Sequence, residues 1–198
     1  MEHGLTDKPQ LLIVGGPNGS GKTTVAMQYA TAHAIEYIGA DAIAASLDPN
    51  DQTSARVEAG RQFVQSVDDA IARKRSCVVE STLSGRSFRN RMLEACSRGY
   101  EITIVFVFVD SVAVCVARVA ERVRKGGHDV PEEDIRRRYT RSIRNFWTLY
   151  RDLADSWVVL YNGGSRIQDV SVGSRQELTV RDATLHTTFL ASFESSND

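Results

Sequence analysis

The feature that most constrains this chain is a glycine-rich segment near its start, Gly16-Pro17-Asn18-Gly19-Ser20-Gly21-Lys22-Thr23. It fits the pattern G-x-x-x-x-G-K-[S/T], in which backbone N–H groups surround the phosphates of a nucleotide. The short apolar run Leu11–Val14 before it predicts a buried strand, and the residues after it predict a helix from about Gly21 to Ala34. Strand, loop and helix in this order are the context that a phosphate-binding loop requires.

Each part of this loop has a predicted role. Lys22 would reach the β- and γ-phosphates, and the Thr23 hydroxyl would hold Mg²⁺. The glycines permit the backbone turns, and the helix N-terminus adds positive potential. The chain contains no Asn-Lys-x-Asp sequence that would read guanine, so we predict ATP as the nucleotide, with Mg²⁺. The predicted ATP-binding residues are Gly16, Pro17, Asn18, Gly19, Ser20, Gly21, Lys22, Thr23 and Thr24.

The rest of the chain alternates apolar runs with amphipathic segments, which predicts a parallel sheet covered on both faces. After a hairpin predicted at Ile167–Val180, a closing helix is predicted at Ala183–Phe193. The fold expected is α/β, a P-loop NTPase three-layer α/β/α sandwich with a mostly parallel sheet. One domain would span residues 1–198, with a small helical lid at about 118–140 and a C-terminal extension at about 163–198. Further strands are expected at Ile35–Ile38, Cys77–Val79, Tyr100–Val109 and Trp157–Tyr161.

Composition and charge exclude several classes of protein. The 198 residues are 42% hydrophobic and 25% charged, as in a globular domain that can bury a core without disulfides. Lys and Arg number 24 against 25 Asp and Glu, so no global basic field favours nucleic acid or an anionic membrane as a partner. The longest apolar run, Ile102–Val109, is far shorter than the ~20 residues of a membrane-spanning helix.

The cysteines and the N-terminal segment indicate the compartment. Cys77, Cys96 and Cys115 are an odd number and form no C-x-x-C pair, which is typical of reduced core thiols. Met1–Gln10 carries charges and lacks the apolar region of a signal peptide. We therefore expect a cytoplasmic protein.

Acidic and hydroxyl side chains follow two predicted strands, at the sheet edge where ligands bind in open parallel sheets. Asp41 follows the second strand, and we predict it as the base that accepts a proton from a substrate hydroxyl. Its alternative role is a simple helix N-cap. Glu80 and Thr82 follow the third strand and are predicted to hold the substrate. Asp110 ends the strongest strand, and there we favour a helix N-cap over a metal-binding role.

Arginines gather in the predicted lid. Arg118 and Arg122 are four residues apart, so they share one helix face and are predicted to stabilise the charge of a transferred phosphoryl group. A flexible Gly126–Asp129 turn follows, and then a helix opened by Pro131 that carries Arg136–Arg138. No aromatic platform accompanies these arginines, which argues against nucleic acid as their ligand.

Together these residues resemble the zeta toxin family of P-loop small-molecule kinases. The resemblance covers about residues 10–162. The best-studied members of that family use ATP and Mg²⁺ to phosphorylate a sugar hydroxyl of UDP-N-acetylglucosamine. The segments that carry the resemblance are the loop at 16–23, Gly39–Ile43 around Asp41, Glu80–Leu83, Arg118–Tyr139 with its Gly-Gly-His-x-Val-Pro-Glu sequence, and Ser142–Phe146.

The resemblance implies that Asp41 is the catalytic base and that Glu80 and Thr82 hold a sugar nucleotide. It also implies a small-molecule substrate and an antitoxin protein as partner. Two positions depart from the family pattern. Ser84 stands where the family has an arginine, with Arg86 further along as a substrate-binding candidate. In the lid, His128 stands where an arginine is expected, so Arg122 or Arg136 would have to serve there.

Two other functions fit the same sequence. A nucleotide-dependent binding switch or ATPase would need no acceptor, and a polynucleotide kinase would act on a 5′-hydroxyl. A common crevice lined by Asp41, Glu80 and Thr82 would argue against the switch.

Overall fold

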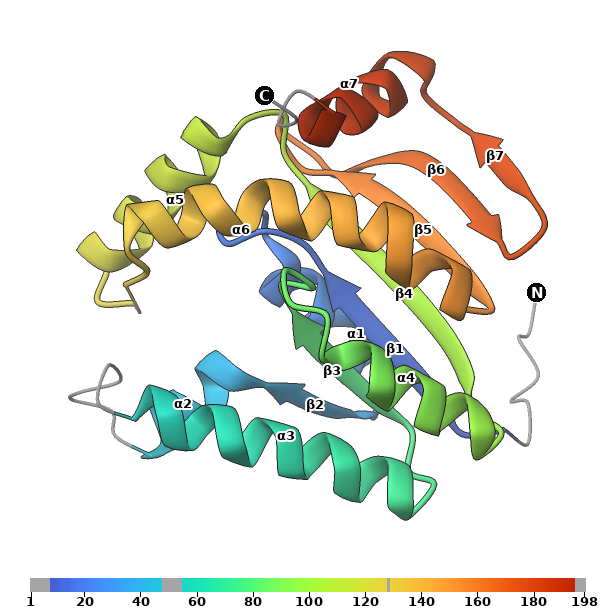
Figure 1. The fold of residues 1–198 in the computed structure, drawn as a ribbon. Coiled ribbons are helices and arrows are strands. Elements are labelled where there is room, and N and C mark those ends of the chain that lie inside the picture. Colours follow the sequence, from blue (N-terminus) through green and yellow to red (C-terminus); the bar gives the residue numbers. More distant parts are fainter. Residues whose placement is uncertain (1–7, 48–54, 128, 195–198) are drawn as a thin grey trace.

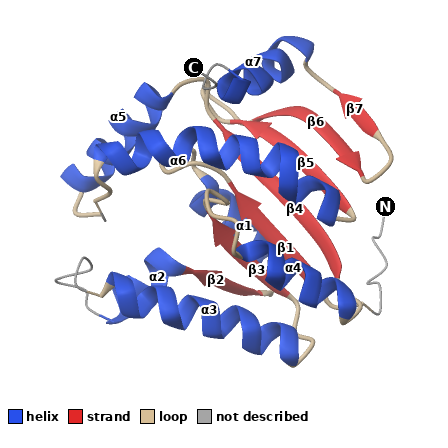
Figure 2. Cartoon of the chain, viewed as in Figure 1, coloured by secondary structure: helices blue, strands red, loops and turns tan. Residues whose placement is uncertain are grey.

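A computed structural model of the protein describes residues 8–47, 55–127 and 129–194. In these residues the chain forms one sheet with helices on both faces (Figures 1 and 2). The strands are β1 Gln10–Gly15, β2 Glu36–Gly39, β3 Cys77–Ser81, β4 Glu101–Phe108, β5 Ser156–Tyr161, β6 Gln168–Ser174 and β7 Leu178–Val180. The helices are α1 Lys22–His33, α2 Ala40–Leu47, α3 Arg56–Ala72, α4 Phe88–Ser97, α5 Val112–Arg124, α6 Glu132–Asn145 and α7 Ala183–Glu194, and a π-helical turn Phe146–Tyr150 and a 3₁₀ turn Arg151–Leu153 continue α6.

The order of the strands is β2-β3-β1-β4-β5-β6-β7. The first five strands pair in parallel, while β6 and β7 add an antiparallel hairpin to the edge at β5. This mostly parallel arrangement confirms the predicted P-loop NTPase fold. Because β1 lies between β3 and β4, the loop that follows β1 is flanked by the ends of both neighbouring strands.

The alternation of side chains along β1 separates the two cores of the sandwich. Leu11 and Ile13 face a core that α3, α4, α6 and α7 cover. Leu12 and Val14 face the opposite core, which α1 closes with its small residues. Figure 1 shows α3, α4 and α6 in front of the sheet and α1 behind it. The helices thus cover the centre of the sheet and leave the strand ends around β1 accessible.

The C-terminal elements belong to the same core. The predicted hairpin and closing helix are confirmed as β6, β7 and α7. Phe189 of α7 is completely buried, and its ring lies edge-on to the rings of Phe106, Phe108 and Phe146. The segment after β5 therefore closes one end of the sandwich.

The structure corrects three local expectations. Ser111, not Asp110, caps α5, because its hydroxyl accepts the N–H of Val114 while its backbone is extended. Asp41 lies in the first turn of α2, which begins at Ala40, so it is not the N-cap. Cys96 is exposed, because α4 buries Phe88, Met92 and Ala95 on its other side; Cys77 and Cys115 are buried as expected. The turn predicted at Pro49–Asp51 lies outside the described residues.

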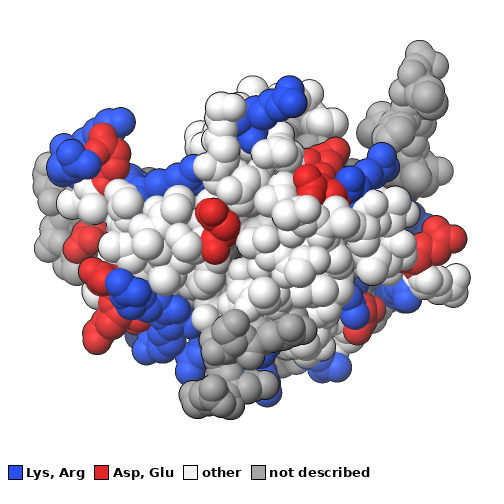
Figure 3. Space-filling view, turned by 90° about the horizontal axis from the view of Figure 1, so that it is seen from above, with Lys and Arg blue, Asp and Glu red and all other residues white. Residues whose placement is uncertain are grey.

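Surface charge shows no dominant sign on the face seen in Figure 3, where basic and acidic atoms are interspersed among uncharged ones. This agrees with the formal net charge of −1. Within the described ranges, no helix is long and apolar enough to cross a membrane.

The aromatic contacts of α7 give a test of its place in the core. Phe189→Ala should lower the free energy of unfolding by about 3–5 kcal/mol, because it leaves a cavity among packed rings. Leu178→Ala, at a side chain 49% exposed on β7, should change it by less than about 0.5 kcal/mol. Urea unfolding followed by circular dichroism measures both, and equal stability of the two variants would contradict the packing of α7.

Candidate active site

The phosphate loop between β1 and α1 is a tight backbone cradle. Gly16, Gly19 and Gly21 have φ angles of +145°, +79° and +94°, which side chains disfavour. A Cβ on Gly16 would lie 2.2 Å from the carbonyl oxygen of Val107, and one on Gly19 would lie 2.7 Å from that of Cys115. The loop is therefore wedged between the end of β4 and the first turns of α5.

Polar groups inside the loop lack partners. Asn18 Oδ1 and Ser20 Oγ are buried and accept or donate no hydrogen bond to any described residue. The Lys22 side chain is also buried, and its Nζ donates to the Pro17 carbonyl at 3.4 Å. Buried polar atoms are normally paired, and at this glycine cradle the Ser20 hydroxyl and the Lys22 ammonium can donate to an anionic ligand, whereas Asn18 Oδ1 can only accept.

Glu80, at the end of β3, is the centre of the polar contacts around Lys22. The Thr23 hydroxyl donates to Glu80 Oε1 at 3.0 Å, and Lys22 Nζ lies 3.6 Å from the same oxygen. The Tyr37 hydroxyl donates to Glu80 Oε2 at 2.5 Å. Burial raises the pKa of Tyr37, and the negative charge of Glu80 raises it further, so the phenol remains a donor.

A pocket of about 220 Å³ opens beside these groups at the carboxyl edge of the sheet. It brings together the phosphate loop, the start of α2 and the end of β3, as the sequence predicted. Its lining residues are Asn18, Lys22, Ala40, Asp41, Phe63, Glu80, Ser81, Thr82 and Arg138. Asp41, Glu80 and Thr82 therefore share one crevice with Lys22.

Helix α5 brings two predicted arginines to this region. Arg118 Nη1 lies 3.5 Å from the carbonyl oxygen of Gly19 in the phosphate loop. Arg122, one turn further, places Nη1 3.8 Å from Asp41 Oδ2. Its Nε and Nη2 atoms are buried and have no hydrogen-bond partner among the described residues. Arg122 thus links α5 to Asp41.

One face of α6 runs along the loop that follows β3. Arg138 lines the pocket, Ser142 donates to the Thr82 carbonyl, and Asn145 donates to the carbonyls of Leu83 and Ser84. These residues follow the i, i+4, i+7 spacing of one helix face.

Arg136 is not on that face, which corrects its prediction as a lid residue at the pocket. Its guanidinium is exposed and pairs with Glu132 at 2.6 Å in the same helix. Two residues turn a helix by about 200°, so Arg138 lines the pocket when Arg136 points away.

Two further predicted residues lie elsewhere. Arg86 lines a separate pocket and is not among the residues around Asp41. His128 lies outside the described residues.

The structure adds a residue that sequence reasoning missed. Asn162, just after β5, donates from Nδ2 to the Ser20 carbonyl at 2.9 Å and so supports the phosphate loop from behind. A Cβ on Gly21 would lie 2.3 Å from this Nδ2. The sequence showed only a turn at Asn162-Gly163-Gly164, whose place beside the phosphate loop depends on the order of the strands.

Comparisons with known proteins agree with this geometry. Residues 11–142 match the profile of a family described as AAA domain. An uncharacterized protein of Haemophilus influenzae is 34% identical over 124 residues, which cover 63% of this chain and 88% of that protein.

Solved structures share the fold at low sequence identity. The AvrRxo1-ORF1:ORF2 complex with ATP matches with a TM-score of 0.71 and 15% identity, over 92% of this chain and 63% of that one. This chain therefore spans less than two thirds of that relative. The PezAT toxin–antitoxin system of Streptococcus pneumoniae matches with a TM-score of 0.58 and 14% identity, over 96% of this chain and 86% of that one.

The close approach of α5 to the phosphate loop gives a matched pair of glycine variants. Gly19→Ala should lower the free energy of unfolding by about 1–3 kcal/mol, because the new Cβ meets the Cys115 backbone at a positive φ. Gly60→Ala should raise it by about 0.5–1 kcal/mol, since that helical glycine has open space around it. Thermal unfolding measures both, and a neutral Gly19→Ala would contradict the described contact.

The cysteines give a second test. Burial raises the pKa of both Cys77 and Cys115 to about 12, so at about pH 8 both remain protonated thiols and poor nucleophiles. Iodoacetamide should therefore label the folded protein only at Cys96, and all three cysteines in denaturant. Peptide mass spectrometry locates the label. Rapid labelling of Cys115 in the folded protein would contradict the burial of this face of α5 in the core.

Proposed function

The chain belongs to the family described as AAA domain, and we propose that it is an ATP-dependent kinase that transfers the γ-phosphoryl group to a hydroxyl of a small molecule. The observation that carries this proposal is the crevice shared by Lys22, Asp41, Glu80 and Thr82. A kinase needs a base and an acceptor site beside its phosphate loop. A nucleotide switch has no use for such a crevice.

The residues of the phosphate loop fit ATP and Mg²⁺. The glycine cradle and the buried Lys22 suit the phosphates, and the unpartnered Ser20 hydroxyl can donate to a phosphate oxygen. The Thr23 hydroxyl and the Glu80 carboxylate, 3.0 Å apart, offer the oxygen ligands that Mg²⁺ prefers. When bound, ATP supplies the phosphoryl group and Mg²⁺ neutralises its charge.

The position of Asp41 supports a role for it as the base. Its carboxylate lines the crevice, and the ion pair with Arg122 restrains its orientation. It would accept the proton of the acceptor hydroxyl as that oxygen attacks the γ-phosphorus. Arg118 and Arg122, both reaching the loop region from α5, would stabilise the negative charge on the phosphoryl group in transfer.

Thr82 would hold the acceptor next to Asp41. Glu80 contacts Lys22 and Thr23 directly, so its carboxylate lies beside the nucleotide site. Glu80 also lines the crevice with Asp41 and Thr82, where the acceptor would bind. Arg138 adds a positive charge at the crevice wall. The α5–α6 hairpin would act as the lid within a single kinase domain.

The resemblance to zeta toxins supports a finer proposal. The acceptor would be a UDP-sugar such as UDP-N-acetylglucosamine, and an antitoxin protein would be the partner in a cytoplasmic system. Ser84 stands where the zeta pattern has an arginine, and Arg86 lines a separate pocket, so neither residue supports the choice of acceptor. The sugar-nucleotide assignment therefore rests on the motifs at Asp41 and Glu80-Ser81-Thr82 alone.

The direct test is an assay of phosphoryl transfer from Mg·ATP, with products read by mass spectrometry. UDP-N-acetylglucosamine, other UDP-sugars, free sugars and an oligonucleotide would be offered side by side. Asp41→Asn should lower turnover by at least ~10²-fold with ATP binding intact, because it removes the base. Lys22→Ala should abolish both ATP binding and turnover.

The result separates the rival functions. ATP hydrolysis without any phosphorylated acceptor, unaffected by Asp41→Asn, would indicate a switch or ATPase. Phosphorylation of the oligonucleotide alone would indicate a polynucleotide kinase. Full turnover by Asp41→Asn on the true acceptor would overturn the assignment of the base.

A further inference from the structure

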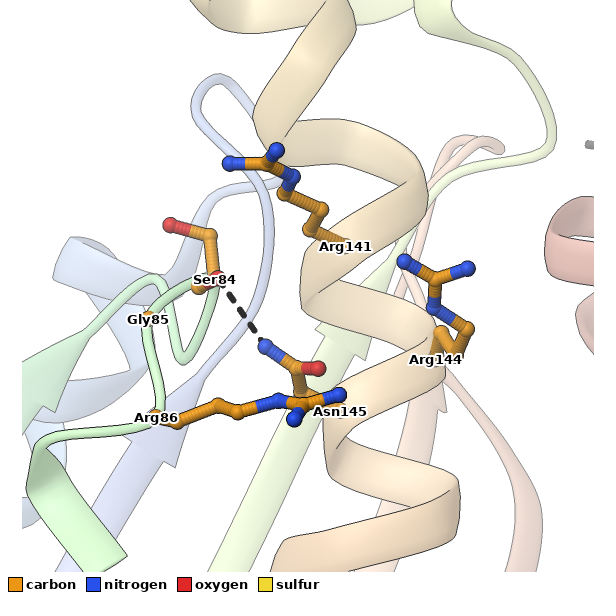
Figure 4. Close-up of a pocket in the computed structure, with 6 residues that line it drawn as sticks. All are labelled: Ser84, Gly85, Arg86, Arg141, Arg144 and Asn145. Carbon is orange, nitrogen blue, oxygen red and sulfur yellow. Dashed lines mark hydrogen bonds between the residues drawn. The ribbon is translucent and has the colours of Figure 1, made fainter.

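A second pocket, of about 330 Å³, lies on the other side of the loop that follows β3. Its lining residues are Ser84, Gly85, Arg86, Arg141, Arg144 and Asn145. In Figure 4, Arg86 extends from the loop toward Asn145, and Arg141 reaches from α6 toward Ser84. Arg144 stands on α6 at a level between them, with its guanidinium on the side of the helix away from the loop. Three arginines are thus among the residues that line this pocket.

This pocket has positive charge without a matching carboxylate. No Asp or Glu is among its lining residues. The acidic residues of α6 all lie in its first turn, where Glu132 pairs with Arg136 and Asp134 pairs with Arg137 and Arg138. Arg141 and Arg144 have no acidic residue three or four positions away in the helix, and they are three residues from each other. Like charges at this spacing repel, so the pair favours a bound anion.

The loop that forms the pocket floor is fixed from several sides. Asn145 donates from Nδ2 to the Leu83 carbonyl at 3.1 Å and to the Ser84 carbonyl at 2.9 Å. The Tyr150 hydroxyl donates to the Gly85 carbonyl at 2.5 Å. Leu83 is buried with a φ of +52°, a strained conformation that such contacts must maintain. The pocket is therefore preorganised before any ligand enters.

The two pockets are neighbours across this loop. Thr82 lines the crevice at Asp41, and its hydroxyl lies 2.9 Å from the Ser84 hydroxyl, which lines the second pocket. A group bound at the arginines is thus separated from the candidate acceptor site by a single stretch of backbone.

We propose that this pocket is a second anion site, which binds a phosphate or diphosphate group independently of the phosphate loop. Guanidinium groups bind phosphate oxygens through paired, charge-assisted hydrogen bonds, and Arg86, Arg141 and Arg144 can offer them from two sides. The group is either a free ion or part of the acceptor molecule. Only the second source rests on the proposed kinase function.

The test uses full-length Lys22→Gln protein, in which the phosphate loop lacks its cation. Inorganic phosphate and pyrophosphate are titrated into it by calorimetry. Pyrophosphate should bind, and Arg141→Gln/Arg144→Gln in this background should weaken it by roughly tenfold or more, as loss of charge-assisted hydrogen bonds predicts. Arg86→Gln, in the exposed loop, is a second variant should the double variant fail to fold.

The control is Arg98→Gln/Arg124→Gln in the same background, which removes the same charge at exposed residues paired with Glu94 and Glu121. Its affinity should stay within about twofold of the parent, because screening weakens distant charges. Absence of pyrophosphate binding to the Lys22→Gln protein, or equal weakening by the control, would overturn the proposal.

A kinetic arm separates the two sources of phosphate. Here Arg141→Gln/Arg144→Gln is compared with the protein that keeps all its arginines, with Lys22 intact in both. A tenfold rise in the KM of the double variant for a phosphorylated acceptor, with its KM for ATP unchanged, would place the acceptor's phosphate in this pocket. Pyrophosphate binding with an unchanged acceptor KM would mark the pocket as a site for a free ion. Pyrophosphate binding without phosphorylation of any acceptor would leave the anion site standing while the kinase proposal fails.

Discussion

The candidate site depends on a backbone-to-backbone approach between the phosphate loop and its neighbours. The loop touches the Val107 and Cys115 carbonyl oxygens at points where even one methyl group would collide. This contact fixes α5 against the loop. Arg118, three residues after Cys115, consequently lies beside Gly19, and Arg122 lies a turn further at Asp41. The glycines therefore determine where α5 sits as well as how the loop turns.

A second constraint acts on the acceptor side. The segment from Ser81 to Arg86 leaves β3 and is held by α6, whose buried Ser142 and Asn145 bind its carbonyls. Leu83 packs under Gly15, where a Cβ would lie 2.6 Å from Leu83 Cδ1. A shift of α6 would thus move Thr82 and Ser84 together, and the crevice and the arginine pocket with them. The two pockets therefore depend on the same contacts with α6.

Local patterns in the sequence were sufficient to predict most of the helices and strands. They also predicted that Asp41, Glu80 and Thr82 lie at one edge of the sheet, since residues at parallel strand ends share that edge. They were insufficient for Tyr37, Arg138 and Asn162. Tyr37 meets Glu80 across 43 positions and Asn162 meets Ser20 across 142, and both contacts follow from the strand order. For Arg138 the missing information was the rotation of α6 about its axis. The buried positions Ile135, Tyr139 and Ser142 now define that rotation.

The charged residues of α6 differ between its two ends, and we expect only the end with Arg141 and Arg144 to contribute to the choice of acceptor. The phosphate loop has the same chemistry for any nucleotide-dependent reaction, so it carries little information about the acceptor. The first turn of α6 neutralises its neighbouring arginines internally, whereas Arg141 and Arg144 remain without such partners next to the loop of Ser84 and Arg86. Arg86 and the arginines of α6 supply positive charge beside Ser84, so we expect the specificity of this chain for its acceptor to reside in α6.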